Sequence, residues 1–135
     1  MTADVIIDHI DHFVLTVRDV AVTCEFYQRA LGMRSEVFGD NRCALKFGRQ
    51  KINLHVAGKE LEPKATHPMP GGGDFCLITK TPIDAVVAHL ESVGVSIELM
   101  PSLRTGAVGP ITSVYFRDPD GNLVEVSTYN NIEVD

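Results

Sequence analysis

The chain contains an internal repeat, and this feature constrains its fold more than any other. The segment that begins at His12 aligns without gaps with the segment that begins at Asp74, at a constant offset of 62 residues, the difference between positions 74 and 12. The matched pairs include Phe13 with Phe75, Leu15 with Leu77, Gly32 with Gly94 and Glu36 with Glu98. We therefore expect two copies of one supersecondary unit, joined by a linker that contains three prolines.

Each copy opens with a strand and continues into a helix. The side chains of residues 12–17 point alternately to a more polar face and to an apolar face, which is the period-two pattern of a strand in a sheet with two different faces. Asp19 is placed to cap the first helix and Gly32 to end it, while Thr81 and Pro82 mark the start of the second helix. Three strands are predicted after each helix, at about 35–38, 43–47 and 51–56, and at about 96–100, 112–116 and 123–128.

These elements predict an α+β fold with two tandem βαβββ modules whose strands form a curved mixed sheet around a metal cavity. We expect a single domain over residues 1–135, in which module one covers about 8–57, a linker covers 58–72 and module two covers about 73–130. The prolines of the linker exclude a helix or a central strand there.

Composition restricts the possible partners and the compartment. The net charge of −6 and the pI near 5.3 disfavour binding to nucleic acid or to an anionic membrane, because both need clustered Lys and Arg. Three cysteines without a CxxC motif, no signal-peptide pattern and no long apolar stretch indicate a reduced, cytoplasmic protein. A hydrophobic content of 44% over 135 residues is enough for one proper core.

Five residues on the polar faces of the predicted strands could bind a divalent cation: His12, Asn53, His55, Asp74 and Glu125. Imidazole and carboxylate groups on stiff strands offer preformed nitrogen and oxygen donors. If these donors fill only part of the coordination shell of the metal, oxygen atoms of a substrate can occupy the rest. A carboxylate next to valines, such as Glu125, is costly unless it is paired or liganded. For His55, a solvent-exposed position at the sheet edge is equally compatible with the pattern. Asn53 is better suited to hydrogen-bond to the metal-binding side chains than to bind the metal itself.

Two further side chains bear on the site. Arg104 belongs to a glycine-containing segment, RTGAVGP, that we expect to be a loop able to close over an anionic substrate, although a solvated loop charge is an equal alternative. Cys76 has the same strand parity as Asp74 and so can line the cavity, but no basic neighbour in the sequence suggests an activated thiolate.

The chain resembles the vicinal oxygen chelate superfamily, which includes glyoxalase I, extradiol dioxygenases, fosfomycin-resistance enzymes and bleomycin-binding proteins. The similarity covers nearly the whole chain and is carried by IDHFVLTVRD, FYQRALGM and DPDGNLVEV. Further segments, QKINLH, EPKATHP and RTGAVGPITSVYFRDPDGNLVEVS, resemble a glyoxalase-domain group that some bacteria contain and that is called virulence proteins.

The resemblance implies a cup around a divalent metal (Mn, Ni, Zn or Fe), a small-molecule substrate and a homodimer. It implies that His12 is the first-strand ligand and Glu125 the last-strand ligand. Asp74 stands where relatives typically have His, and Asn53 falls where glyoxalase I typically has Glu or a similar ligand. The site therefore differs from that of glyoxalase I.

These expectations lead to three hypotheses. The first is a metal-dependent glyoxalase-type lyase or isomerase, with Glu125 as the catalytic carboxylate, His12, His55, Asp74 and Glu125 as metal ligands, and Asn53 and Arg104 at the substrate. The second is an Fe(II) extradiol-type dioxygenase that uses His12, His55 and Glu125. The third is a non-catalytic protein that sequesters a ligand, as bleomycin-resistance proteins do.

Overall fold

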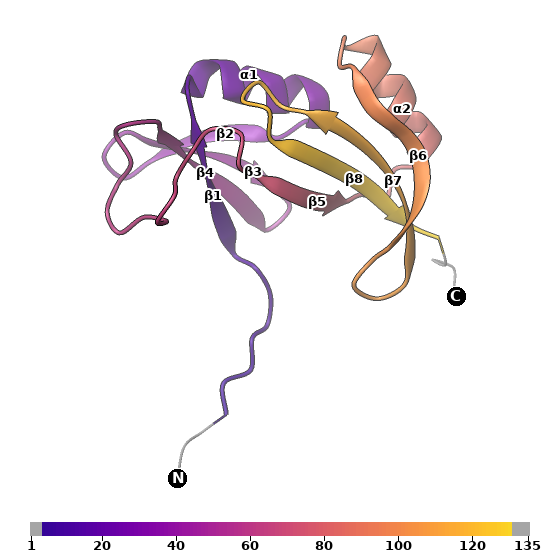
Figure 1. The fold of residues 1–135 in the computed structure, drawn as a ribbon, viewed down its shortest axis with the longest axis horizontal. Helices are drawn as coiled ribbons and strands as arrows, with labels where there is room; N and C mark the ends of the chain where they lie inside the picture. Colours follow the sequence, from indigo (N-terminus) through magenta and orange to yellow (C-terminus); the bar gives the residue numbers. More distant parts are fainter. Residues whose placement is uncertain (1–3, 131–135) are drawn as a thin grey trace.

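The computed structural model describes residues 4–130 of the chain and contains two βαβββ modules (Figure 1). Module one consists of β1 (His12–Val17), α1 (Val20–Leu31), β2 (Arg34–Phe38), β3 (Arg42–Phe47) and β4 (Gln50–Val56). Module two consists of β5 (Asp74–Ile78), α2 (Ile83–Ser92), β6 (Ile97–Thr105), β7 (Pro110–Arg117) and β8 (Leu123–Tyr129). The predicted α+β architecture of two repeated modules is thereby confirmed.

Each module forms its own four-stranded mixed sheet. The strand orders are β1-β4-β3-β2 and β5-β8-β7-β6, in which the first pair is parallel and the others are antiparallel. The strands β1 and β5 are the edge strands at which the two sheets meet, and the rings of Phe13 and Phe75 touch there with centroids 4.9 Å apart. Within residues 4–130 no hydrogen-bonded ladder joins the two sheets, so they approach as separate sheets.

Local signals in the sequence explain most helix boundaries. Asp19 accepts a hydrogen bond from the Val22 amide at 3.1 Å, and Gly32 ends α1 in the left-handed conformation at φ 69°, as predicted. The cap predicted for the second helix is wrong in detail, because Pro82 occupies the cap position of α2 and no side chain caps the helix there. Thr81 instead donates its backbone N–H to the Thr79 hydroxyl at 3.0 Å.

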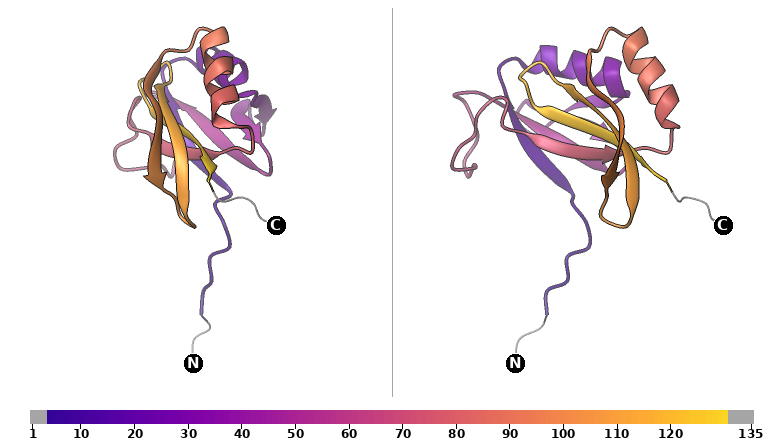
Figure 2. Two further views of the ribbon diagram at one scale, coloured as in Figure 1. Left: turned by 90° about the vertical axis from the view of Figure 1, so that its right-hand side faces the viewer. Right: turned by 45° about the vertical axis from the view of Figure 1, so that its right-hand side comes forward.

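One hydrophobic core serves both modules. It contains the apolar side chains of β1, β3 and β4, those of β7 and β8, and the inner faces of both helices. Figure 1 shows the two helices above the sheets, and the views in Figure 2 show that they lie on the same side. Because the apolar faces of both sheets turn toward this shared core, their polar faces lie on its outside.

A buried polar cluster around Asp118 ties the modules together. The Asp118 carboxylate accepts hydrogen bonds from the Tyr27 hydroxyl of α1 at 2.7 Å and from the backbone N–H groups of Asp120 and Asn122 at 2.9 and 3.0 Å. The Asn122 side chain donates to Asp118 at 2.8 Å and accepts from the Gly73 amide at 2.6 Å. Burial, with the neighbouring Asp118 carboxylate, raises the pKa of the Tyr27 phenol, so it remains a protonated donor. The cluster therefore connects α1, the β7–β8 turn and the start of β5.

Among residues 4–130, no helix has the length and apolar character that a membrane span requires.

Candidate functional site

Module one presents three of the predicted residues on one face. The parallel register of β1 and β4 places Val14 opposite Asn53 and Thr16 opposite His55, and His12 belongs to the same face by alternation. His12, Asn53 and His55 line one cavity of about 400 Å³. Its remaining walls are Val14, Arg42, Leu61, Glu62 and Pro63, so the 58–72 linker encloses part of this face.

Two hydrogen-bonding facts distinguish this cavity. Asn53 is only 4% exposed, yet its Oδ1 atom has no hydrogen-bond partner among the described residues. The His12 Nδ1 atom lies 2.8 Å from the Asp11 carboxylate, and this hydrogen bond lowers the pKa of Asp11. An imidazole held in this way through Nδ1 leaves Nε2 available to a ligand.

Module two presents Glu125 at the centre of its polar face. The register places Cys76 on one side of Glu125 and Tyr115 on the other. The Ser113 hydroxyl donates to Glu125 Oε2 at 2.6 Å. Burial raises the pKa of the Cys76 thiol, the nearby Glu125 carboxylate acts in the same direction, and the Ser127 hydrogen bond opposes them. Cys76 is therefore a protonated thiol near neutral pH, in agreement with the absence of an activating base in its sequence context.

Arg104 lies in β6, so the expectation that it belongs to a loop is wrong. The strand is longer than the sequence pattern suggested, because pairing with β7 continues to Thr105 opposite Pro110. The Arg104 Nε atom donates to the Tyr115 hydroxyl at 3.0 Å, and the guanidinium lies 5.5 Å from the centre of the Tyr115 ring. Arg104 thus shares the polar face of module two with Glu125.

Sequence reasoning missed Ser113 and Tyr115. Both residues have the strand parity that faces Glu125, and the alternation of the predicted 112–116 strand could have revealed them. Serine and tyrosine occur on either face of a strand, so the residue types themselves gave no signal.

The structure distributes the predicted ligands over separate cavities. A cavity of about 800 Å³ at the β1 and β5 edges is lined by His12, Asp74 and Cys76, whereas Glu125 lines a smaller cavity of about 270 Å³ on module two. Within residues 4–130, no three or more His, Cys, Asp or Glu side chains gather closely enough to hold a metal ion. Each module therefore carries part of a donor set, and the ligand assignment stays a prediction.

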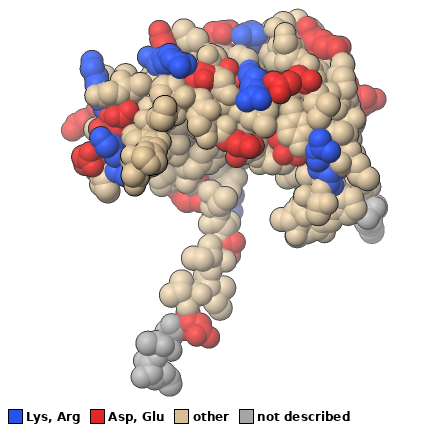
Figure 3. Space-filling model, in the orientation of Figure 1, with Lys and Arg blue, Asp and Glu red and all other residues tan. Residues whose placement is uncertain are grey.

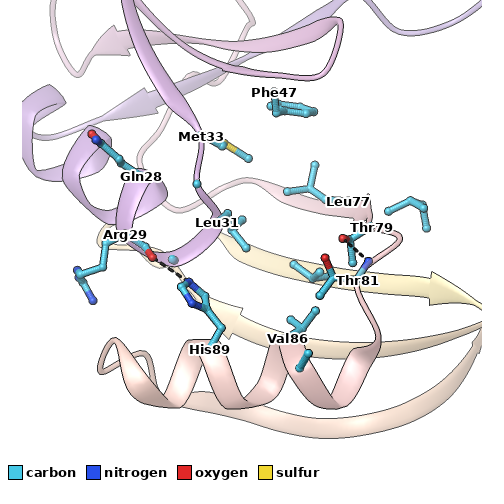
Figure 4. A pocket seen from close by; sticks show the side chains of 15 residues that line it. Gln28, Arg29, Leu31, Met33, Phe47, Leu77, Thr79, Thr81, Val86 and His89 are labelled. Carbon is cyan, nitrogen blue, oxygen red and sulfur yellow. Dashed lines mark hydrogen bonds between the residues drawn. The ribbon is translucent and has the colours of Figure 1, made fainter.

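The other surfaces of the described chain present fewer groups that could bind a metal or take part in a reaction. A pocket of about 410 Å³ between α1 and α2 is mostly apolar, and its His89 imidazole contacts the Arg29 carbonyl at 3.1 Å (Figure 4). None of the predicted site residues lines this pocket. Figure 3 shows acidic and basic side chains interspersed over the face it draws, without an extended basic patch.

Comparisons with known proteins agree on one family. The family model described as the Glyoxalase/Bleomycin resistance protein/Dioxygenase superfamily matches residues 9–126. The chain is 55% identical over 124 residues to virulence protein STM3117 of Salmonella typhimurium, covering 92% of this chain and 86% of that protein. The crystal structure of that protein has a TM-score of 0.91 to this chain at 54% identity, covering 93% of this chain and 99% of the other.

Two further relatives carry names from the same family. Glyoxalase domain-containing protein RDO1 of Mycosarcoma maydis is 50% identical over 122 residues, covering 90% of this chain and 69% of that protein. The crystal structure of lactoylglutathione lyase from Agrobacterium tumefaciens is 26% identical with a TM-score of 0.67, covering 89% of this chain and 92% of the other.

Proposed function

Because the chain belongs to the Glyoxalase/Bleomycin resistance protein/Dioxygenase superfamily, we propose that it is a divalent-metal-dependent glyoxalase-type lyase or isomerase. Its substrate is a small molecule that chelates the metal through oxygen atoms. His12 and Glu125 are metal ligands, and His55 and Asp74 complete the shell.

The observation that carries this proposal is that the buried side-chain oxygen of Asn53, Oδ1, has no hydrogen-bond partner among the described residues. An unsatisfied buried polar atom costs about 1–3 kcal/mol, so such atoms in native proteins usually have an ion, a water or a ligand as partner. Asn53 shares its cavity with two imidazoles, His12 and His55. Nitrogen and oxygen donors of this kind fit Mn²⁺, Ni²⁺, Zn²⁺ or Fe²⁺.

The residues of the two faces have distinct roles in the proposed reaction. A bound metal supplies Lewis acidity that polarises a carbonyl or hydroxyl oxygen of the substrate. Glu125 would accept the proton of the carbon next to the polarised carbonyl group and return it to the carbonyl carbon. Asn53 pairs with a substrate hydroxyl, and Arg104 binds an anionic group of the substrate, with the Tyr115 hydroxyl orienting its guanidinium.

A second copy of the chain completes the site in this proposal. The two half-sets of donors lie on the outside of the shared core, and within residues 4–130 no three of them gather closely enough to hold a metal ion. Module one of one copy facing module two of another would bring His12 and His55 together with Glu125.

Metal content tests the proposed function directly. Wild-type protein purified without chelator and without an affinity-tag metal should contain divalent metal close to one ion per site, and the His12→Ala variant should lose it. Comparison of His55→Ala with Asp74→Ala then identifies the ligand that completes the coordination shell, because loss of a ligand should lower bound metal to background, whereas loss of a group that only orients a ligand should weaken binding about 10–100-fold. Wild-type protein that takes up no metal, even on reconstitution, would contradict the proposal and favour a ligand-sequestering protein.

The N-terminal arm, residues 4–11, should contribute to dimer formation. Val5, Ile6 and Ile7 are 83%, 87% and 81% exposed, and the arm stands clear of the body in Figures 1 and 3. Burial of each such side chain contributes about 1.5–3 kcal/mol. The double variant Ile6→Ser/Ile7→Ser should therefore weaken the dimer by at least about 100-fold in sedimentation equilibrium.

The matched control for the arm is Val22→Ser, which changes an aliphatic residue of α1 that is 50% exposed. This variant should keep the wild-type association constant. Unchanged association in the arm variant would show that the arm lies outside the dimer interface.

An Fe(II) extradiol-type dioxygenase is the second candidate function. The observation in its favour is that His12 and His55 line the same cavity, so two imidazoles are available to join Glu125 in a two-His, one-carboxylate set. Oxygen consumption by the Fe²⁺-loaded protein with a catechol would establish this activity. Metal-dependent turnover of a 2-oxoaldehyde adduct without oxygen consumption would establish the lyase.

A further inference from the structure

A row of serine hydroxyls crosses the polar face of module two beside Glu125. Ser102, Ser113 and Ser127 are neighbours in the registers of β6, β7 and β8, so their side chains project from the same face. Ser113 and Ser127 are fully buried, at 0% exposure. The Ser102 hydroxyl has no hydrogen-bond partner among the described residues, whereas Ser113 and Ser127 are both hydrogen-bonded. Buried hydroxyls are unfavourable unless they are hydrogen-bonded, so the partners of Ser113 and Ser127 indicate why these two are there.

The directions of these hydrogen bonds follow from counting protons. Ser113 has one hydroxyl proton, and it is donated to Glu125 Oε2 at 2.6 Å. Ser127 lies 2.5 Å from the Ser113 hydroxyl and 3.4 Å from Glu125 Oε2, so its one proton goes to the much closer Ser113 oxygen. Cys76 lies 3.2 Å from the Ser127 hydroxyl and is then the donor in that contact. Successive donors thus lead from Cys76 through Ser127 and Ser113 to Glu125.

We propose that Ser113 is a positioning residue for Glu125, holding Oε2 so that Oε1 alone is presented to the metal and the substrate, and that Ser127 and Cys76 strengthen this hold. This inference rests on the proposed function, in which Glu125 is a metal ligand. A chain of aligned hydrogen bonds polarises each successive donor, so the last bond, from Ser113 to Glu125, gains from the two before it.

The geometry explains why a fixed carboxylate is needed. Glu125 has three rotatable side-chain bonds and is only partly buried, so packing alone leaves it several conformers. A carboxylate held through one oxygen offers the other as a monodentate ligand, whereas a free carboxylate can rotate or bind through both oxygens. Groups that orient metal ligands in this way typically change metal affinity 10–100-fold when they are removed.

The test compares Ser113→Ala with Thr112→Ala, a variant of the adjacent residue on the same strand. Thr112 also donates a side-chain hydroxyl bond, to Asn130 at 2.7 Å, but it belongs to the opposite face of the sheet. Two measurements are made on the full chain. One is the affinity for Mn²⁺, and the other is the rotamer distribution of Glu125 in the metal-free protein, from side-chain NMR couplings.

Ser113→Ala should bind Mn²⁺ about 10–100-fold more weakly, and its Glu125 side chain should average over rotamers where wild type holds one. Thr112→Ala should match wild type in both measurements. A Ser113→Ala protein with wild-type Glu125 order would overturn the inference, whatever its metal affinity. Wild-type protein that binds no Mn²⁺ would instead contradict the proposed function, and the metal-free NMR comparison would still decide the role of Ser113.

Discussion

Replacing Glu125 with alanine is expected to reduce bound divalent metal from about one ion per site to background. In the proposed site Glu125 is the carboxylate at the centre of the polar face of module two, and among residues 4–130 no other carboxylate lines its cavity. Glu125 accepts its short hydrogen bond from the Ser113 side chain, not from the backbone, so its loss leaves the backbone ladders of β8 intact. Elemental analysis should show the loss of metal, while the circular dichroism spectrum of the metal-free variant stays that of folded wild type. Full metal retention in this variant would contradict the assignment.

The same variant tests whether two copies share the site. When Glu125→Ala and His12→Ala proteins are mixed and allowed to exchange subunits, a mixed dimer pairs the intact module one of the first with the intact module two of the second. Random exchange makes half of the dimers mixed, each with one repaired site of two, so metal content should recover to about a quarter of wild type. Mixing without any recovery would mean that His12 and Glu125 of a single chain act together.

Replacing Asp118 with alanine is expected to have the largest effect on stability, a loss of about 3–4 kcal/mol in the free energy of unfolding. The change leaves the Tyr27 hydroxyl, the Asn122 side chain and two backbone N–H groups without their acceptor in a buried region. It also removes a link between α1 and the β7–β8 turn. Urea unfolding monitored by circular dichroism measures the effect.

Two comparison variants make the Asp118 result interpretable. Tyr27→Phe removes a single donor from the cluster and should cost about 1–2 kcal/mol. Asp19→Ala removes the exposed cap of α1, a carboxylate of the same type, and should cost about 1 kcal/mol. If Asp118→Ala were no more destabilising than Asp19→Ala, the buried cluster would not be the connection between the modules that its hydrogen bonds indicate.

The repeat in the sequence was sufficient to predict both modules, because strand alternation and helix capping are local properties. Asp19 and Gly32 act through backbone groups a few residues away, so their roles are independent of the rest of the fold. Where a boundary depended on a neighbouring strand, prediction failed. Arg104 lies in β6 because β7 pairs with it there, and its glycine-rich neighbourhood gave no sign of this.

For the candidate site, the sequence identified donors through strand parity and family resemblance, and it placed His12, Asn53 and His55 on one face in agreement with the register. It did not identify Ser113, because a serine hydroxyl becomes significant only when register places it 2.6 Å from a carboxylate.

The sequence by itself determined most of the secondary structure, the duplication and the chemical types on each polar face, all of which follow from periodicities of two and 3.6 residues. Only the tertiary structure decided how the two modules sit together. That arrangement depends on contacts such as the Tyr27 hydroxyl with Asp118, between residues 91 positions apart, and on the burial of both helices in one core. The polar faces therefore lie outside that core, and the grouping of the proposed metal ligands depends on three-dimensional packing that no local pattern encodes.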